Sequence, residues 1–154
     1  MHWEEKYSKN FKEFFAKIIT WNPDYIVPVA RKACKLLKAN KEQIELPTDT
    51  IFFRKYFEFC KPDISGKKIA IFDDSVNHGT TLYEHRTFFE NLGAKVNCYA
   101  FVLRESSIKN NLFYGPKPII GIPFSDQEYL EYLSCQEEFL VSQGDHLDID
   151  HLVL

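Results

Sequence analysis

The 154-residue sequence predicts an α/β fold in which a mostly parallel central sheet is flanked by helices. Apolar runs of strand length alternate with segments of helical periodicity, which is the pattern of successive strand–helix–strand units. One run, residues 69–72 (Ile-Ala-Ile-Phe), contains four apolar residues without alternation, as expected for a strand buried on both faces. Because the length suits a single core, we expect one domain over residues 1–154.

The first half of the chain shows two helical patterns and two strand patterns. A helix is expected over residues 4–19, where five apolar residues recur at helical spacing: Tyr7, Phe11, Phe14, Phe15 and Ile18. A strand is expected over residues 25–30, followed by a helix over 31–39 whose lysines face outward. The aromatic-rich segment 51–57 is predicted to be a second strand.

The middle of the chain repeats the strand–helix–strand pattern. The buried strand that begins at residue 69 is expected to end at Asp73-Asp74, and a helix follows over residues 80–91. Gly93 is a plausible stop for that helix, because glycine readily adopts the left-handed conformation found after helix ends. Residues 96–103 are predicted to form the next strand. Two such units in succession favour parallel strands joined by right-handed crossovers.

The last third of the chain gives weaker patterns. A short edge strand is expected over residues 118–123 and an acidic helix over 125–140, while 141–154 receives no assignment. Aspartate and histidine recur between Asp145 and His151 in a spacing that could place metal ligands on one face of a strand. The same spacing is common in acidic tails, so the role of this segment stays open.

Composition and charge exclude several classes of function. The 19 basic and 22 acidic residues leave a net charge of -3, which gives no general nucleic-acid footprint. No run approaches the ~18 apolar residues of a membrane span. The first ten residues lack the apolar stretch of a signal peptide, so we expect a cytoplasmic protein with reduced cysteines.

The most informative segment is residues 69–82, where a buried strand leads into a polar loop and then a helix. The strand brings Asp73 and Asp74 to its carboxyl end, which is the edge of an open α/β sheet where ligands bind. Gly79 can adopt a positive φ or let a ligand approach closely. Two threonines then begin a helix whose free N–H groups suit a phosphate. Together these features favour a phosphorylated sugar or nucleotide, whose hydroxyls or Mg²⁺ ion the carboxylates could hold.

This segment resembles the phosphoribosyl-pyrophosphate (PRPP) motif of the type I phosphoribosyltransferases, which has four apolar residues, two acidic residues, a short variable stretch and Thr-Gly-x-Thr. The resemblance implies a Rossmann-like phosphoribosyltransferase core. It assigns Asp73 and Asp74 to catalysis, as the pair that holds the ribose hydroxyls and, directly or through water, Mg²⁺. It places the 5′-phosphate in a loop of five residues: Asn77, His78, Gly79, Thr80 and Thr81.

The resemblance extends over about residues 21–104 and is closest in local motifs to the orotate phosphoribosyltransferases. Phe53-Arg54-Lys55 looks like the Val-Arg-Lys before the family's mobile loop, and residues 24–37 look like its first strand, pyrophosphate loop and helix. These matches imply that four cations meet pyrophosphate: Arg31, Lys32, Arg54 and Lys55. Residues 1–20 and 112–154 would then supply a hood or accessory elements.

Each assignment has a plainer alternative. The acidic pair could be a solvated strand end, and His78 could be a loop histidine without a role. Arg31 and Lys32 could be the charged start of an amphipathic helix. Arg54 and Lys55 could be edge charges that discourage strand-to-strand aggregation.

The sequence also departs from the family pattern at three places. His78 stands where the family usually has threonine or serine, and the segment Val29-Ala30-Arg31 lacks the glycine of the pyrophosphate loop. Only ten residues separate Lys55 from Gly66, so the mobile loop expected there is short. Such loops exclude water and complete the catalytic site.

Two functions follow from the resemblance. The first is an enzyme that binds PRPP with Mg²⁺ and transfers the phosphoribosyl group to a nitrogenous acceptor, releasing pyrophosphate. The second is a non-catalytic sensor of PRPP or a nucleotide that regulates a protein partner, including a component of a prokaryotic antiviral conflict system. The resemblance also implies a homodimer.

Overall fold

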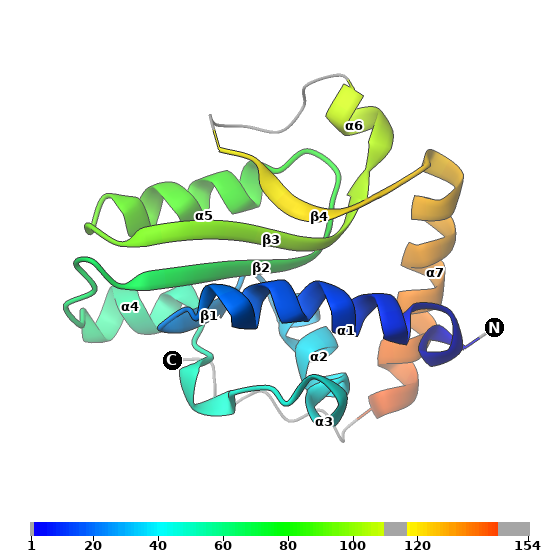
Figure 1. Ribbon diagram of the computed structural model, residues 1–154, viewed down its shortest axis with the longest axis horizontal. Coiled ribbons are helices and arrows are strands. Elements are labelled where there is room, and N and C mark those ends of the chain that lie inside the picture. Colours follow the sequence, from blue (N-terminus) through cyan, green and yellow to red (C-terminus); the bar gives the residue numbers. More distant parts are fainter. Residues whose placement is uncertain (1, 110–116, 145–154) are drawn as a thin grey trace.

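A computed structural model describes residues 2–109 and 117–144 and contains a four-stranded parallel sheet with helices on both faces (Figure 1). The strands lie in the order β1-β2-β3-β4, and each neighbouring pair is parallel. The predicted α/β fold with a parallel sheet is therefore confirmed. In chain order, the elements are α1 (Trp3–Trp21), β1 (Tyr25–Pro28), α2 (Arg31–Ala39), α3 (Lys41–Ile44), the 3₁₀ helix η1 (Thr48–Thr50), α4 (Arg54–Cys60), β2 (Lys68–Val76), α5 (Thr80–Glu90), β3 (Lys95–Arg104), α6 (Glu105–Lys109), β4 (Ile119–Phe124) and α7 (Asp126–Gln143).

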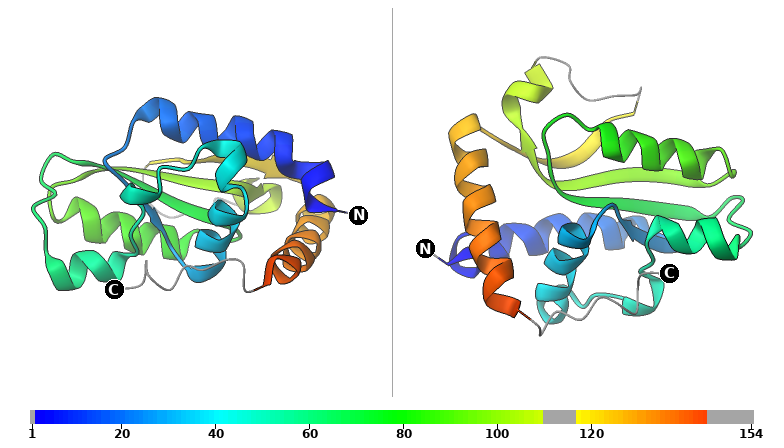
Figure 2. Two further views of the ribbon diagram at one scale, coloured as in Figure 1. Left: turned by 90° about the horizontal axis from the view of Figure 1, so that it is seen from below. Right: turned by 180° about the vertical axis from the view of Figure 1, so that it is seen from behind.

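Each face of the sheet has its own apolar core. Phe72 of β2 contributes to the core shared with α1, whereas Ile69 and Ile71 contribute to the opposite core, as alternation along a strand requires. Figure 2 shows α1 over one face and α4 and α5 over the other. On the α1 side, the ring of Phe11 lies 6.2 Å from that of Phe72 and 5.0 Å from that of Phe101. Helix α1 therefore covers a face of the sheet.

The predicted strand over residues 51–57 is wrong, because residues 54–60 form helix α4. Phe57 is buried in the core beneath α4 and α5, and Arg54 pairs with Glu58 one turn later at 3.0 Å. The pair of Arg54 and Glu58, four residues apart, is typical of a helix. The aromatic content of this segment indicated burial correctly, but it did not fix the period of the backbone.

Ile51 alone keeps an extended pairing, and this pairing sets the topology. It forms a parallel bridge with Ile26 on the side of β1 that faces away from β2. After β1, the chain passes through α2 to Ile51 on one edge of β1. It then passes through α4 to β2, which pairs with the other edge of β1. The carboxyl ends of β1 and β2 therefore flank a point where the chain direction reverses, which is where open α/β sheets bind ligands.

Most other elements follow the prediction, with one difference that bears on the candidate site. Strand β2 does not end at Asp73-Asp74 but runs to Val76, and its Ser75 pairs with Val102 of β3. Gly93 has φ 87° shortly after α5, as expected of a helix stop. The segment from Asp145 to His151 lies outside the described residues. Among the described helices, none combines the length and apolar character needed to cross a membrane.

Candidate functional site

The loop after β2 forms a pocket of about 250 Å³ at the carboxyl end of the sheet. Gly79 is the N-cap of α5 with φ 85°, a conformation that glycine adopts without strain. The first N–H groups of α5 are therefore at the pocket, as an anion would require. The structure brings Asp73 together with all five predicted phosphate-loop residues, since the pocket is lined by Asp73, Ser75, Val76, Asn77, His78, Gly79, Thr80, Thr81 and Leu82.

Asn77 anchors this loop to two later elements. Its Oδ1 accepts hydrogen bonds from Nη1 of Arg104 at 3.3 Å and from the hydroxyl of Ser107 at 3.2 Å. Arg104 also donates to both carboxylate oxygens of Asp126, at 3.0 and 3.3 Å. Nδ2 of Asn77 lies 3.3 Å from Nε2 of the exposed His78. The side chain of Asn77 thus holds the loop in place, which leaves the backbone N–H groups as the donors for an anion.

The two aspartates have different surroundings, because β2 continues past them. Neighbouring side chains on a strand point to opposite faces. Asp73 lines the loop pocket, whereas Asp74 is only 7% exposed and accepts a hydrogen bond from Nε2 of Gln136 in α7 at 2.6 Å. The hydroxyl of Tyr132 donates to Oε1 of Gln136, also at 2.6 Å. A buried polar chain therefore connects the acidic pair to α7.

Burial governs the charge of the Asp73 carboxyl, and the neighbouring Asp74 adds to the effect. Burial raises the pKa of Asp73 to about 9, with further contributions from a hydrogen bond to Asp74 and from its negative charge. With a pKa near 9, the Asp73 carboxyl keeps its proton at neutral pH. A divalent cation could replace that proton, and carboxylate oxygens are the ligands that Mg²⁺ prefers. Within the described residues, no group of three or more His, Cys, Asp or Glu side chains is arranged to hold a metal ion.

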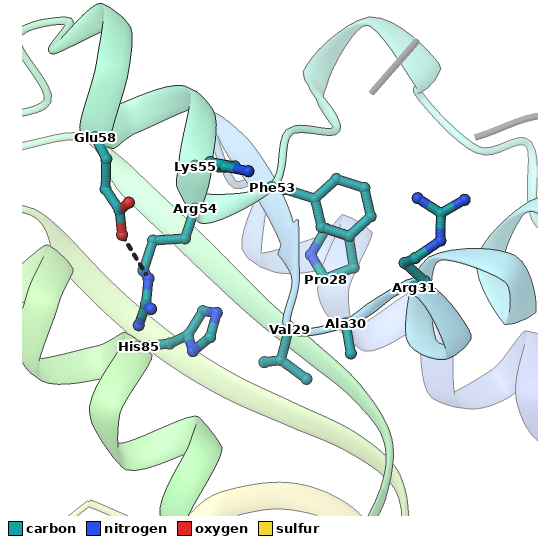
Figure 3. A pocket seen from close by; sticks show the side chains of 9 residues that line it. All are labelled: Pro28, Val29, Ala30, Arg31, Phe53, Arg54, Lys55, Glu58 and His85. Atoms are coloured by element: carbon teal, nitrogen blue, oxygen red, sulfur yellow. Dashed lines mark hydrogen bonds and ion pairs between the residues drawn. The ribbon is translucent and has the colours of Figure 1, made fainter. Parts of the chain in front are cut away.

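A second pocket, of about 370 Å³, lies at the carboxyl end of β1 and is referred to here as the basic pocket (Figure 3). Three of the four predicted pyrophosphate cations contribute to it. Figure 3 shows Arg31 on one side, Arg54, Lys55 and His85 on the other, and Val29 and Ala30 between them. The basic pocket is lined by Pro28, Val29, Ala30, Arg31, Phe53, Arg54, Lys55, Glu58 and His85.

Lys32, the fourth predicted cation, lies outside the basic pocket. Its Nζ is 3.1 Å from Oε2 of Glu137 in α7, and it lines a separate cavity together with Arg31 and Lys35. The first two cations of α2 thus share this cavity, and Arg31 also lines the basic pocket. Of the two, only Arg31 reaches the basic pocket.

Helix α5 joins the two pockets within one helical turn. Thr81 lines the loop pocket and His85, four residues later, lines the basic pocket. Nδ1 of His85 lies 3.0 Å from the carbonyl oxygen of Thr81. A ligand that filled both pockets would therefore contact the first two turns of α5.

Helix α7 lies across the end of the sheet where β2 and β3 terminate (Figure 1). Three of its polar residues contact residues predicted to belong to the site or residues that hold it. These contacts are Gln136 to Asp74, Glu137 to Lys32, and Asp126 to Arg104, which in turn holds Asn77. The helix begins with a capping box formed by Ser125 and Glu128, so its start is well defined.

Solved phosphoribosyltransferase structures are similar to this chain in fold. Orotate phosphoribosyltransferase from Aeropyrum pernix matches with a TM-score of 0.55 and 15% identity, over 85% of this chain and 77% of that one. The chain has a phosphoribosyltransferase-like fold. A hypoxanthine phosphoribosyltransferase from Staphylococcus aureus matches with a TM-score of 0.55 and 14% identity, over 80% of this chain and 76% of that one.

A third similar structure belongs to a longer protein. UMP synthase from Leishmania donovani matches with a TM-score of 0.52 and 18% identity, over 85% of this chain but only 31% of its own length. No model of a known protein family matches the chain, and no curated protein matches it in sequence. The phosphoribosyltransferase-like fold is therefore recognised from the structure and the short motif together.

Sequence reasoning missed three residues that line or hold the two pockets: His85, Arg104 and Gln136. His85 follows Thr81 by four residues, so helical periodicity places both on one face of α5. Gln136 stands among the buried residues of α7, and a polar residue on such a buried face was a usable signal. Arg104 directly follows the strand expected over residues 96–103, and no local pattern indicates its contact with Asn77, 27 residues earlier in the chain.

Proposed function

We propose that the chain binds PRPP with Mg²⁺ and transfers the phosphoribosyl group to a nitrogen nucleophile, with release of pyrophosphate. The observation that carries this proposal is the pair of pockets lined by residues of the first two turns of α5, at the switch point of the sheet. The loop pocket offers backbone N–H groups to a 5′-phosphate. The basic pocket offers three cations to a pyrophosphate group. PRPP carries both groups on one ribose.

In the proposed reaction, the nucleophile attacks C1 of the ribose while the bond from C1 to the pyrophosphate oxygen breaks. The electron pair of that bond leaves with pyrophosphate, and Arg31, Arg54 and Lys55 stabilise the charge that develops there. Asp73, which lines the loop pocket, accepts hydrogen bonds from ribose hydroxyls and orients the ring. A Mg²⁺ ion held by Asp73 and Asp74 would neutralise part of the ligand's charge.

A second candidate function is a sensor that binds the same ligand without turning it over. Two observations favour it: Asp74 is held by Gln136, and residues 54–60 form α4 where related enzymes are expected to have a mobile loop. A sensor would show binding without pyrophosphate release, and its output would be contact with a protein partner. Homodimer formation and a cytoplasmic location remain predictions under either function.

Calorimetric titration with PRPP and Mg²⁺ tests the proposal on three proteins: wild type, Arg54→Ala and the double variant Asp73→Asn/Asp74→Asn. Lys95→Ala is the matched control, because it removes one positive charge at the opposite, amino-terminal edge of the sheet, where Lys95 is exposed. Each protein is then assayed for pyrophosphate with a panel of nitrogenous bases and with no acceptor. We expect the wild type and Lys95→Ala to bind alike, and Arg54→Ala to bind about tenfold more weakly or worse.

Three outcomes separate the candidates. Base-dependent pyrophosphate release that falls by orders of magnitude in the double aspartate variant supports the transferase. Binding that needs Arg54 but yields no pyrophosphate with any base supports the sensor. Absence of PRPP binding, or equal binding by wild type and Arg54→Ala, contradicts both functions.

A further inference from the structure

His85 brings a hydrogen-bond acceptor into a pocket whose other ionisable groups are three cations and one carboxylate. The side chain is only 6% exposed and lines the basic pocket, and the carboxylate, Glu58, is already paired with Arg54 at 3.0 Å. Figure 3 shows the imidazole ring beside the Arg54 guanidinium, on the side of Val29. A nearly buried histidine at an anion pocket calls for a chemical explanation.

The hydrogen bond to Thr81 fixes which nitrogen of His85 carries the proton. A carbonyl oxygen can only accept a hydrogen bond, so Nδ1, at 3.0 Å from it, must be the donor. In a neutral imidazole the other nitrogen, Nε2, then holds a lone pair. Nε2 has no hydrogen-bond partner among the described residues. The ring therefore presents an unused acceptor to the basic pocket.

Burial keeps the His85 side chain neutral. Burial is the main cause that lowers the pKa of His85, and the positive charge of Arg54 lowers it further. The hydrogen bond to Thr81 and the negative charges of Glu84 and Glu58 oppose this shift without reversing it. The remaining ionisable groups at the pocket, Arg31 of α2 and Lys55 of α4, are cations as well. At pH 7.5 Nε2 is therefore an acceptor in a cationic pocket.

We propose that Nε2 of His85 accepts a hydrogen bond from a protonated phosphoryl oxygen, so that the basic pocket selects phosphate and pyrophosphate over fully ionised oxyanions such as sulfate. Phosphate and pyrophosphate keep a proton near neutral pH, whereas sulfate does not. The cations attract all three anions. Only the protonated ones can satisfy Nε2, because an acceptor facing an oxyanion without hydrogen is repelled and left unpaired. This inference rests on the proposed function and specifies the leaving group that its pocket recognises.

Two substitutions separate the two nitrogens of the ring. In His85→Asn, the amide nitrogen falls near the position of Nδ1, so the bond to Thr81 can persist while the acceptor at the Nε2 position is lost. In His85→Gln, the terminal amide reaches the Nε2 position, so its oxygen can replace the acceptor. The two variants thus remove the acceptor or restore it, with side chains of the same chemical class.

The test is calorimetric titration with inorganic phosphate, pyrophosphate and sulfate at pH 7.5 without Mg²⁺. We expect the wild type to bind phosphate at least about tenfold more tightly than sulfate, which corresponds to one charge-assisted hydrogen bond. His85→Asn should bring the two affinities close to each other, and His85→Gln should keep most of the difference. In the wild type, the ¹⁵N resonance of Nε2 should move on addition of phosphate but not of sulfate, a readout that does not depend on how the variants fold.

The outcomes distinguish this inference from the proposed function. Pyrophosphate binding that depends on Arg54, combined with equal affinity of the wild type for phosphate and sulfate, would overturn the role of His85 and leave the pocket standing. An unchanged preference in His85→Asn would overturn it too. If the wild type binds none of the three anions, the basic pocket is not an anion site and both ideas fail.

Discussion

The half-buried carboxyl of Asp73 should lower the stability of the folded protein at neutral pH. Burial, followed by its hydrogen bond to Asp74 and by that residue's charge, raises the pKa of Asp73 to about 9. In the unfolded chain an aspartate ionises near pH 3.9. Between these values the folded protein keeps a proton that the unfolded chain has released, so stability is greatest at low pH and falls as the pH rises. Asp73→Asn should remove this loss.

The size of the effect follows from the interval between the two pKa values. Each pH unit within the interval changes the free energy of unfolding by at most about 1.4 kcal/mol, which gives roughly 4 kcal/mol from pH 5 to pH 8. Asp73 is partly exposed and shares its proton with Asp74, so solvent and coupling reduce this figure. We therefore expect the difference in the free energy of unfolding between Asp73→Asn and the wild type to grow by about 2 kcal/mol from pH 5 to pH 8.

Urea unfolding in metal-free buffer at about pH 5, 6.5 and 8 measures this difference. The variant should be more stable than the wild type at the highest pH, and its advantage should shrink toward the lowest. Asp49→Asn is the control, because Asp49 is an exposed carboxylate in η1, and it should follow the wild type at every pH. A difference between Asp73→Asn and the wild type that does not change with pH would refute the reasoning.

Three further predictions concern α7, the sheet edge and the thiols. Gln136→Leu should lower the free energy of unfolding, measured in urea, by about 2–3 kcal/mol, because it leaves the Asp74 carboxyl without its partner. The control Gln127→Leu, at an exposed position of the same helix, should change this free energy by less than about 0.5 kcal/mol. Gly121→Ala should lower the melting temperature by several degrees, since its Cβ would lie 2.0 Å from the carbonyl oxygen of Ala100; an unchanged melting curve would contradict the close packing of β4 on β3. In timed thiol labelling followed by mass spectrometry, the exposed Cys60 should react first. Cys34 and Cys98 should react only after unfolding, because they are buried and burial raises the pKa of each thiol to about 11.

Local periodicity was enough to predict most of the fold. The unbroken apolar run at residues 69–72 indicated the central strand, because strands buried on both faces of a parallel sheet are typically continuous apolar runs. The same reasoning failed at residues 54–60, where aromatic side chains suit a strand or a helix equally well. Contacts from elsewhere decide that segment: the ring of Phe57 packs 5.0 Å from that of Phe89 in α5. Such a contact leaves no trace in the local pattern.

Part of the candidate site could also be predicted from local sequence, and part could not. The phosphate-loop residues lie close together in the structure because they are neighbours in the chain, so the motif alone could gather them. The surroundings of Asp74 could not be predicted, because Gln136 lies 62 residues away along the chain. Lys32 likewise has a partner in α7, Glu137, and lies away from the basic pocket. Charge type and spacing predicted which residues are available for a site, and long-range packing decided which of them reach it.

Helix α7 has a consequence for how proteins of this kind can be compared. A chain shortened before Asp126 would retain every residue of the 69–82 motif, yet Asp74 would lose its amide partner and Arg104 and Lys32 would lose their acidic ones. The two chains would share the 69–82 motif but differ around Asp74. In the full chain Asp74 is held by Gln136, and in the shortened chain it would lack this partner. A comparison limited to the motif would treat them as equivalent. The environment of Asp74 therefore depends on the motif together with helix α7.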